Sequence, residues 1–448
     1  MNKNGFLLCA LLTLLSLAAC IDESLDYETF QVPVTLSNPI TGGNISDVDV
    51  FITSSSGNVW SASTDTDGIA DFRLPAGLYS ISASASYKDE YGVSYLLNLS
   101  SNEICISADS CKDGIDPLEF TLSSSRKGSL VIKELYNGGC TKDDGSGNYR
   151  FDQYCTIYNN GQTPVTMRQL CLAMAAPYNA QGNNGNYRQG VLTYANAGFI
   201  PAIQAIWYFQ DSITLQSNEE LTIAIDGAID HTKTYSNSVD LSKGEYYCNY
   251  DPLSFTNTNY YPVPSTLIPQ SHYLKAAFYG QGTAWPLSTT APAFFIFNIP
   301  DSITPTAFAA DNGNIWYSEG KSSPIYACLK IPTEWIVDAI EVFTTTSSQN
   351  RKRLTDAVDA GAAYLTNQLG YSLHRIVDTK ATLAIEGNAG KIVYGLPSTT
   401  GEPATVVVCD PAGINAEASV RNGAVIIYQD TNNSKNDFFE RYQSALRD

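Results

Sequence analysis

The first 20 residues constrain this chain more than any other segment, because they decide in which compartment it folds. Lys3 provides a short basic start, and residues 6–19 form an almost unbroken apolar run that ends in small residues just before Cys20. This is the layout of a secretory signal. The run is shorter than the roughly 18 to 20 apolar residues that a membrane-spanning helix needs. We therefore expect an exported chain whose body folds outside the cytoplasm.

Residues 17–20, Leu-Ala-Ala-Cys, resemble a bacterial lipobox. The resemblance implies that residues 1–19 are a signal peptide and that Cys20 becomes the lipidated first residue, with palmitate among its acyl chains. Several acyl chains anchor a protein far better than one. The acidic tether 20–30 resembles the surface-export signal of Bacteroidetes lipoproteins, although a merely solvated tether would have a similar composition. We expect a lipid-anchored outer-membrane protein that is exposed on the cell surface.

The charge of the chain argues against nucleic acid as a partner. Its formal net charge is −19 at pH 7, and Lys3 is the only charged residue of the predicted signal, so removing that one positive charge gives −20. A body this acidic repels phosphate backbones. The run Arg351, Lys352 and Arg353 is more typical of a solvated turn than of a binding patch.

The cysteines predict disulfide bonds. Outside the signal and Cys20, eight remain, and an even count in an exported chain favours disulfides. We predict the local pairs Cys105–Cys111 and Cys140–Cys155. The other four cysteines allow three pairings, among which the sequence does not choose: Cys171, Cys248, Cys328 and Cys409.

The sequence pattern of residues 31–124 predicts a first β domain. Residues 48–52 and 78–83 have the alternating apolar pattern of half-buried strands. Between them, residues 65–72 (Asp-Thr-Asp-Gly-Ile-Ala-Asp-Phe) and 74–79 (Leu-Pro-Ala-Gly-Leu-Tyr) resemble the carboxypeptidase regulatory-like, prealbumin-type sandwich. Asp and Gly both tolerate the left-handed backbone of a tight hairpin, which independently supports a turn there. Residues 123–128 resemble a linker.

A second β domain is predicted over residues 128–448. Residues 153–160, Gln-Tyr-Cys-Thr-Ile-Tyr-Asn-Asn, resemble a strand of the lamin-tail type of sandwich. With later segments such as 225–231, 331–341 and 428–438, the chain resembles an uncharacterised Bacteroidetes lipoprotein family of unknown function, in which a regulatory-like sandwich precedes a lamin-tail-like domain. Long insertions around 175–200 and 245–310 depart from the lamin-tail pattern.

We therefore predict a mainly β fold of two consecutive β-sandwich domains, the second with long insertions and little helix. Two short helices are expected. One runs over residues 333–342, where Thr333 would cap the helix after Pro332. The other lies within residues 353–369, although Gly361 weakens it.

No catalytic motif stands out. There is no HExxH, no GxSxG and no complete phosphate loop. Asp230 and His231 would suit a general base, but without a paired nucleophile a structural role is favoured. A hydrolase that uses two carboxylates stays open, since nothing singles out two of the many acids. We expect a protein without enzymatic activity.

One segment has the composition of a calcium loop. Asp430, Asn432, Asn433 and Asp437 would supply oxygen ligands. The glycine and the late glutamate of an EF-type loop are missing, and Asn-rich segments also form plain turns. Calcium is the one cofactor that the sequence suggests.

Aromatic side chains gather in the insertion 245–310. Exposed aromatic residues on long loops stack on sugars or anchor partners, although tyrosines also pack plainly on sheets. We predict a ligand or partner surface there, formed by Tyr246, Tyr247, Tyr250, Tyr260 and Tyr261.

These features together suggest a surface-exposed lipoprotein that acts as a non-enzymatic binding or accessory protein. Nutrient capture with a TonB-dependent transporter is expected by analogy with other surface lipoproteins, with a glycan or a small nutrient as the ligand. The alternative is a structural or adhesive surface module, stabilised by calcium if the acidic loop binds it.

Overall fold

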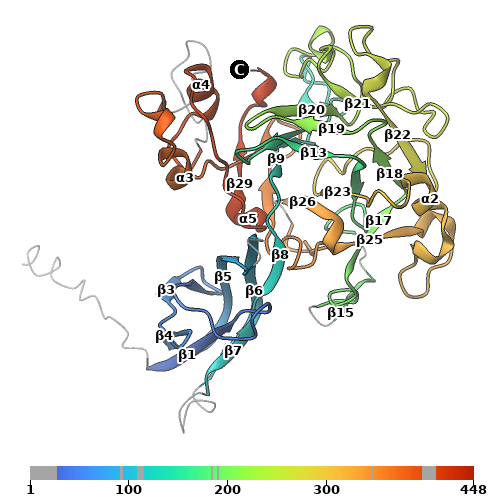
Figure 1. Ribbon diagram of the computed structural model, residues 1–448. Coiled ribbons are helices and arrows are strands. Elements are labelled where there is room, and N and C mark those ends of the chain that lie inside the picture. Colours follow the sequence, from blue (N-terminus) through green and yellow to red (C-terminus); the bar gives the residue numbers. More distant parts are fainter. Residues whose placement is uncertain are drawn as a thin grey trace, which may run out of the picture.

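The computed structural model describes residues 28–90, 94–107, 116–182, 185–188, 191–344, 347–395 and 410–447 (Figure 1). The predicted signal, Cys20, most of the tether, Cys111 and Cys409 lie outside the described residues. The described chain is mainly β, as predicted, and its α-helices are short: α2 (Pro305–Ala310), α3 (Thr379–Leu383), α4 (Ala416–Arg421) and α5 (Ser434–Asp437).

Two sheets form a β-sandwich at the N-terminal end. One contains β4 (Ile69–Pro75), β1 (Thr29–Ser37) and β7 (Leu118–Thr121), and the other contains β3 (Val59–Ser63), β2 (Asp49–Ser54), β5 (Gly77–Lys88), β6 (Ser94–Ile106) and β8 (Ser123–Arg126). In β1, Val32, Val34 and Leu36 alternate into a core made only of residues from this sandwich. The period-2 pattern therefore places one face of each sheet inward.

The acidic turn of the sandwich is organised by Asp65. Its carboxylate accepts hydrogen bonds from the N–H groups of Asp67 and Ile69, both at 2.9 Å. Gly68 has a φ of +77°, a conformation that side chains with a Cβ rarely adopt. Residues 123–126, which resemble a linker, instead extend the second sheet as β8, paired with β6 at Tyr95 to Asn98.

A 12-stranded sheet dominates the rest of the chain. Its order is β27 (Ala363–Leu365), β26 (Ile336–Thr344), β23 (Ala293–Asn298), β14 (Leu170–Met174), β18 (Ala205–Tyr208), β22 (Tyr273–Phe278), β21 (Tyr247–Asn249), β20 (Glu220–Ala224), β12 (Tyr154–Asn159), β9 (Leu130–Tyr136), β28 (Ser372–Arg375) and β29 (Phe438–Arg441). The sheet curls strongly, so that β26 near one end of this order meets β9 near the other: the carboxylate of Asp338 accepts a hydrogen bond of 2.5 Å from the N–H of Ile132.

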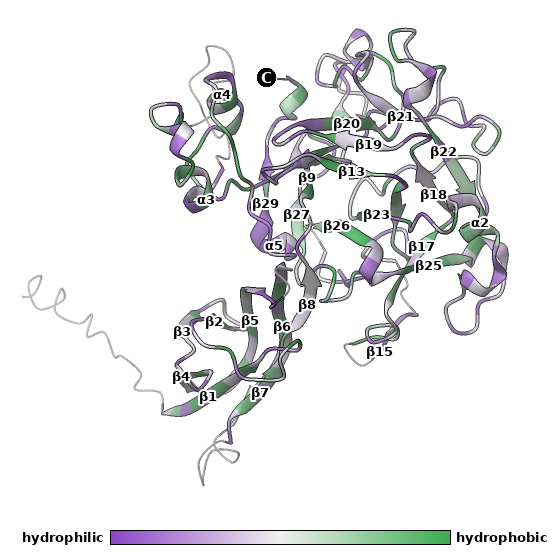
Figure 2. Ribbon diagram, in the orientation of Figure 1, coloured by the Kyte–Doolittle hydropathy of each residue, from purple (hydrophilic) through white to green (hydrophobic). Residues whose placement is uncertain are grey.

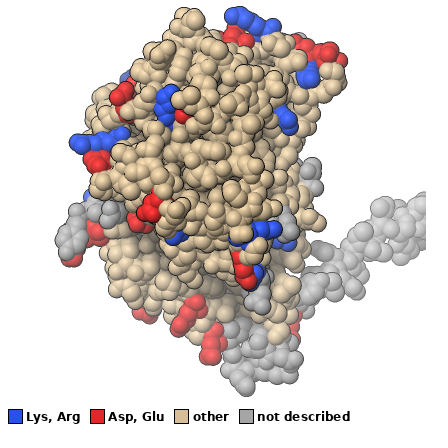
Figure 3. Space-filling model, turned by 90° about the vertical axis from the view of Figure 1, so that its right-hand side faces the viewer, with Lys and Arg blue, Asp and Glu red and all other residues tan. Residues whose placement is uncertain are grey.

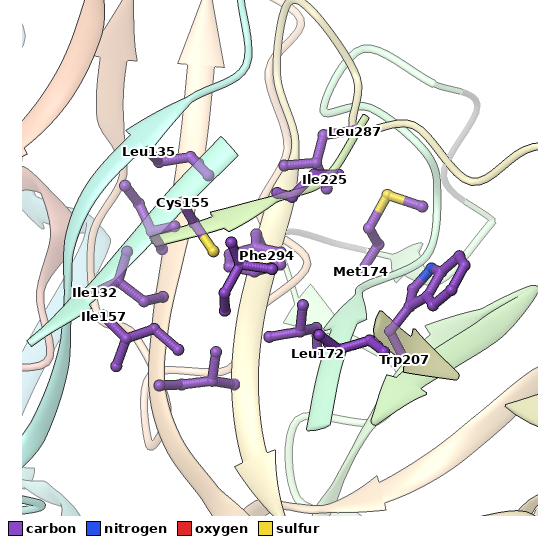
Figure 4. Packing of buried hydrophobic residues seen from close by; sticks show 14 of the residues in the cluster. Ile132, Leu135, Cys155, Ile157, Leu172, Met174, Trp207, Ile225, Leu287 and Phe294 are labelled. Carbon is purple, nitrogen blue, oxygen red and sulfur yellow. The ribbon is translucent and has the colours of Figure 1, made fainter. Parts of the chain in front are cut away.

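Several of these strands are buried on both faces. In β23, Phe294 and Ile296 lie in one core, and Phe295 and Phe297 lie in a second core on the other face. Figure 4 shows the first core, where side chains from β9, β12, β14, β18 and β23 converge. Strands buried on both sides read as continuous apolar runs, and β23 (Ala-Phe-Phe-Ile-Phe) does so (Figure 2).

Smaller sheets cover this body. They are β10 (Cys140–Thr141) with β11 (Asn148–Tyr149), β13 (Val165–Met167) with β19 (Ile213–Leu215), β15 (Tyr187–Arg188) with β16 (Val191–Leu192), and β17 (Phe199–Ile203) with β25 (Cys328–Pro332) and β24 (Ile315–Trp316). The last of these contributes Ile200, Leu329 and Ile331 to the second core.

Both predicted helices of the second domain are wrong. Residues 333–335 form a single 3₁₀ turn, and residues 336–344 form strand β26. Residues 353–369 form turns and the short strand β27. In β26, Ile340 points toward one core and Ala339 toward the other, so both faces of the sheet are satisfied, and this outweighs the local capping signal of Thr333.

The sandwich and the large body lie end to end (Figure 1). The amide of Asn98 donates to the carbonyl of Thr431 at 2.5 Å and links the two. β20, β21 and β22 lie at the far end of the body from β1, where the tether would join (Figure 1). No helix in the described ranges is long and apolar enough to cross a bilayer.

Candidate functional site

The structure divides the predicted aromatic cluster among different places. Tyr246 and Tyr247 line a surface groove. Tyr261 lies in the core, with its ring 5.7 Å from that of Trp207. Tyr250 packs edge-on against Tyr273. Tyr260 lines a separate small pocket. Only the first two of the five predicted residues therefore share one site, and Phe255 joins Tyr261 in the core.

The groove has a volume of about 720 Å³. Strands β19 and β20 form one wall, and the segment leading into β21 forms the other, with the chain end nearby. β21 pairs in parallel with β20 at Ile223↔Tyr247 and with β22 at Cys248↔Tyr273. Successive residues of a strand point to opposite faces, so Cys248 is buried while Tyr247 reaches the groove. The charged and aromatic side chains that line the groove are Glu219, Glu220, Lys243, Glu245, Tyr246, Tyr247 and His272.

Tyr247 and His272 form a rigid aromatic platform in the wall of the groove. The rings of Tyr247 and His272 stack with centroids 4.0 Å apart and planes 12° from parallel. The Nδ1 of His272 lies 3.1 Å from the carbonyl oxygen of Tyr246, which fixes the imidazole ring. On the core side, Phe209 packs against Tyr247 with ring centroids 5.2 Å apart. The platform is therefore preorganised by packing and by a hydrogen bond.

Charged groups surround the platform in fixed positions. Glu220 pairs with Lys133 at 2.7 Å, and Glu219 accepts a hydrogen bond of 2.7 Å from the N–H of Gln216. Lys243 lies over the ring of Tyr246, with its Nζ 5.6 Å from the centroid. The groove thus combines flat rings with anchored carboxylates, an arrangement that favours a ligand rich in both hydroxyls and apolar faces.

His272, Lys243 and the three glutamates were missed by sequence reasoning. Tyr247 and His272 are 25 residues apart, and only the parallel pairing of β20, β21 and β22 brings them together. The aromatic composition of the insertion was the one local signal, and it identified the platform tyrosine but not its partner.

The predicted calcium loop is organised by an arginine. Asp437 lies 3.6 Å and Asp430 lies 3.7 Å from Nη1 of buried Arg375, and Asp338 also pairs with that guanidinium. Asn433 caps α5 by accepting from the N–H of Lys435. These contacts give the acids a counter-ion within the chain. Within the described ranges no group of three His, Cys, Asp or Glu side chains is arranged to hold a metal ion, and calcium at this loop stays a prediction.

Burial and mutual repulsion raise the pKa values of Asp338 and Asp437. Burial, with a smaller contribution from the charge of Asp430, raises the pKa of Asp437 to about 7, although the charge of Arg375 opposes the shift. Burial likewise raises the pKa of Asp338 to about 7. Asn432, the remaining member of the predicted ligand set, has a φ of +50° at the turn before α5. Asp430 and Asp437 of the loop and Asp338 of β26 therefore form a buried cluster of three acids around Arg375.

The predicted Cys140–Cys155 disulfide is wrong. Tyr154 pairs with Tyr136 and Cys155 with Leu135 across β12 and β9, so Cys155 points into the first core. The thiol of Cys140 instead lies near Tyr136, on the opposite face. Six of the predicted disulfide cysteines are described, and each is a free thiol: Cys105, Cys140, Cys155, Cys171, Cys248 and Cys328. Cys171 and Cys248 lie in different cores.

The Asp230–His231 pair does not form a general base. Asp230 caps a 3₁₀ turn by accepting from Thr232. His231 is held between the hydroxyl of Tyr149 at 2.7 Å and the carbonyl of Gly227 at 2.5 Å. Burial lowers the pKa of His231 to about 4. Its ring is a neutral, hydrogen-bonded structural element.

The fold and the groove define a class of protein: a mainly β chain with an N-terminal sandwich and a larger β body that carries a preorganised surface groove. Residues 216–393 match the family model described as "Protein of unknown function (DUF4876)". This confirms the resemblance to an uncharacterised family of unknown function, and the matched region contains the whole Tyr247–His272 platform.

Comparison with solved structures shows the fold. A DUF4876 family protein from Bacteroides thetaiotaomicron VPI-5482 is similar, at 19% identity with a TM-score of 0.50, over 92% of this chain and 94% of that chain. Fervidolysin from Fervidobacterium pennivorans, a keratinolytic enzyme, aligns at 12% identity over 44% of this chain and 30% of its own, and its TM-score of 0.18 supports no conclusion. No curated protein matches the sequence.

Proposed function

We propose that the chain is a lipid-anchored surface lipoprotein that captures a carbohydrate nutrient in the Tyr247–His272 groove, without enzymatic activity, beside a TonB-dependent transporter. The stacked platform in the wall of a groove of about 720 Å³ carries the proposal. Flat rings pack against the apolar C–H faces of a sugar, while charged oxygens form the stronger hydrogen bonds to its hydroxyls. Glu219, Glu220 and Glu245 supply such oxygens.

The position of the groove supports capture at a cell surface. The predicted lipid on Cys20 would hold the sandwich close to the membrane, since β1 begins at Thr29. The groove-forming strands β20 and β21 lie at the opposite end of the molecule (Figure 1). If the lipid anchors the chain as we propose, a tether at one end and a groove at the other would hold the groove away from the membrane, toward polymers in the medium.

A broad face of the body suits contact with another protein. Between residues 246 and 300 the only charged residues are Asp251 and Lys275, and Asp251 is buried. Figure 3 shows few charged side chains across the middle of this side of the molecule. Leu253, Val263 and Leu267 of the same insertion are 95%, 76% and 68% exposed. Exposed apolar side chains in a stretch with so few charges are typical of protein contacts, and the transporter as partner rests on analogy.

Replacing Tyr247 with alanine is expected to weaken carbohydrate binding at least tenfold. The substitution removes the ring that holds the imidazole of His272 in its stacked position, so the platform loses the ordered flat face that it would offer to a sugar. Affinity electrophoresis of the full chain through gels containing starch, xylan, pectin or mucin measures this as a loss of retardation. The matched control is Tyr326→Ala, because Tyr326 is 47% exposed and lies outside the groove.

Equal retardation of wild type, Tyr247→Ala and Tyr326→Ala by every polymer that binds would overturn the carbohydrate groove. Circular dichroism confirms that each variant is folded before binding is compared. Loss of binding in Tyr326→Ala alone would place the carbohydrate site elsewhere.

A pull-down of the lipidated protein from its own outer membrane tests the transporter partner. We expect a β-barrel transporter to co-purify with wild type, and much less of it with the triple variant Leu253→Ser, Val263→Ser, Leu267→Ser. A triple variant at the exposed sandwich and body residues Val59, Leu78 and Val420 is the matched control. If the protein co-purifies with an envelope polymer and without a β-barrel transporter, the result would instead favour a structural or adhesive module.

A further inference from the structure

A cleft of about 660 Å³ lies between the N-terminal sandwich and the large body. Strands β2, β5 and β6 of the sandwich form one wall, and β15, β26, β27 and α5 of the body form the other. The hydrogen bond from Asn98 in β6 to Thr431, just before α5, holds the two walls together (Figure 1). Ligand sites typically measure roughly 300–1,000 Å³, so the cleft is large enough for an organic molecule.

The lining of this cleft is basic, although the chain as a whole is acidic. The chain has 45 Asp and Glu residues against 26 Lys and Arg residues. The described residues that line the cleft nevertheless include no acid, and their three bases are Arg351, Lys352 and Lys435. The Tyr247–His272 groove differs, because three glutamates and one lysine line it. An anionic ligand is therefore attracted to the cleft and repelled by the groove.

Two of these bases are anchored beside the same loop. Nζ of Lys352 donates to the carbonyl oxygen of Asp359 at 2.5 Å and pairs with the carboxylate of Asp356 at 2.8 Å. Lys435 of α5 packs against Gly361, where an added Cβ would lie only 2.9 Å from the Cβ of Lys435. Glycine at this position therefore allows α5 to approach the loop closely. As a result, the two lysines line the cleft from neighbouring positions.

The third base, Arg351, is held by its backbone and by a ring. Its N–H donates to the carbonyl of Ala180 at 3.0 Å, and its guanidinium lies over Tyr187, with Cζ 5.9 Å from the ring centroid. Nη1 donates to the carbonyl of Asn350 at 2.8 Å. Within the described chain, neither Arg351 nor Lys435 forms an ion pair. Both charges are therefore available to a ligand, and a guanidinium can bind a carboxylate through two parallel hydrogen bonds.

The walls of the cleft also offer hydroxyl groups and an aromatic side chain. Ser82 of β5 and Ser100 of β6 lie directly opposite each other in the antiparallel pair. Alternate residues of a strand share a face, so Ser80 and Ser82 both point away from the sandwich core and toward the cleft. On the body side, exposed Tyr364 packs edge-on against Phe343, with ring centroids 6.0 Å apart. Hydroxyls and aromatic rings beside positive charge suit a sugar that carries acidic groups.

We propose that this cleft binds an acidic oligosaccharide, whose anionic groups pair with Arg351 and Lys435 while its hydroxyls face the serines of the sandwich wall. An inorganic anion would occupy only a small part of a cleft of about 660 Å³ and would leave the aromatic and serine walls without a contact. Nucleic acid suits the site poorly, because the net charge of the chain repels a long phosphate backbone. The site is separate from the Tyr247–His272 groove and does not depend on carbohydrate capture there.

Calorimetric titration of the full chain with trigalacturonic acid, which carries carboxylates, and with a κ-carrageenan tetrasaccharide, which carries sulfates, tests the proposal and distinguishes the two anionic groups. We expect saturable binding that weakens as sodium chloride is added. The double variant Arg351→Gln, Lys435→Gln should bind about tenfold more weakly or less, because two charge-assisted contacts are lost. The matched control is Arg168→Gln, Lys233→Gln, which removes the same charge from side chains that are 72% and 79% exposed.

Equal binding to both double variants, or no binding of either acidic oligosaccharide to wild type, would overturn the proposal. Sodium sulfate that binds as tightly as the oligosaccharides would overturn it in favour of a simple anion site. Loss of binding in Tyr247→Ala, with the cleft variant unchanged, would assign the acidic sugar to the groove instead. Ser82→Asp tests the opposite wall, since it places a negative charge in the cleft and should also weaken binding; unchanged binding in that variant would contradict the site.

Discussion

Replacing Arg353 with leucine is expected to destabilise the protein by about 3–5 kcal/mol, because it leaves a fully buried glutamate without its counter-ion. The side chains of Arg353 and Glu341 are both 0% exposed. Nε and Nη2 of Arg353 donate to Oε1 of Glu341 at 2.8 and 2.5 Å. Nη1 also donates to the carbonyl of Ala291 at 2.8 Å, so the substitution leaves that carbonyl without this donor as well.

The exposed ion pair Arg168–Asp301 provides the control. Its side chains are 72% and 57% exposed, and exposed pairs contribute little, so Arg168→Leu should change the free energy of unfolding by no more than about 0.5 kcal/mol. Urea denaturation of both variants measures the difference. Similar midpoints for the two variants would show that the Arg353–Glu341 pair is no more important to the fold than a surface pair.

The same arginine shows where sequence reasoning fails. The run Arg351, Lys352 and Arg353 reads as a solvated turn, and this is wrong for its last member. Lys352 pairs with Asp356 at 2.8 Å on a partly exposed face, whereas Arg353 is buried against β26. A basic residue is rarely buried without a partner, and the partner lies 12 positions earlier in a segment predicted as helix. The charges of three consecutive residues cannot reveal that Arg353 pairs with Glu341.

The N-terminal sandwich was predictable because its determinants are local. Alternation in β1 and the Asp65–Gly68 turn each specify their conformation within a few residues. The large body is different, since several of its strands are buried on both faces and lose the period-2 signal. Residues 336–344 illustrate this: the capping signal of Thr333 after Pro332 predicts a helix that runs into them, and only the cores on both sides make them strand β26.

The candidate site was only partly predictable for a related reason. Composition indicated the aromatic insertion, but whether a tyrosine faces the groove, the core or the small pocket that Tyr260 lines depends on strand pairings between distant segments. The Cys140–Cys155 prediction fails in the same way. Proximity in sequence suggested a bond, while the pleat of β12 directs Cys155 to the face opposite Cys140.

Replacing Arg375 with methionine is expected to cost about 3–5 kcal/mol at pH 8. Arg375 is 1% exposed and is the cation that Asp338, Asp430 and Asp437 share. It also donates from Nε to the carbonyl of Ile132 at 2.8 Å. Methionine approximates the length of the aliphatic stem, so the loss comes mainly from three buried acids that no longer face a positive charge.

The destabilisation caused by Arg375→Met should increase as the pH rises. Burial raises the pKa of Asp338 and Asp437 to about 7, against roughly 3.9 in an unfolded chain. The folded state therefore holds protons that the unfolded chain releases, so the stability they contribute is fully present below about pH 4 and is lost as the pH rises through about 7. Without Arg375 these pKa values rise further, and the loss continues to higher pH. The difference between Arg375→Met and wild type should therefore be smaller at pH 5 than at pH 8.

The double variant Arg375→Met, Asp430→Asn separates charge from packing. Asp430 contributes repulsion to both neighbouring acids, and its Oδ1 has no hydrogen-bond partner, so its neutralisation removes charge at small cost. We expect it to recover part of the loss at pH 8 and almost none at pH 5, measured by urea denaturation at both values. A penalty that is equal at the two pH values, and that Asp430→Asn leaves unchanged, would mean that Arg375 stabilises the loop through its packing and its backbone hydrogen bonds. In that case the acidic loop would not depend on charge balance, and a cation bound to its carboxylates would have to be considered again.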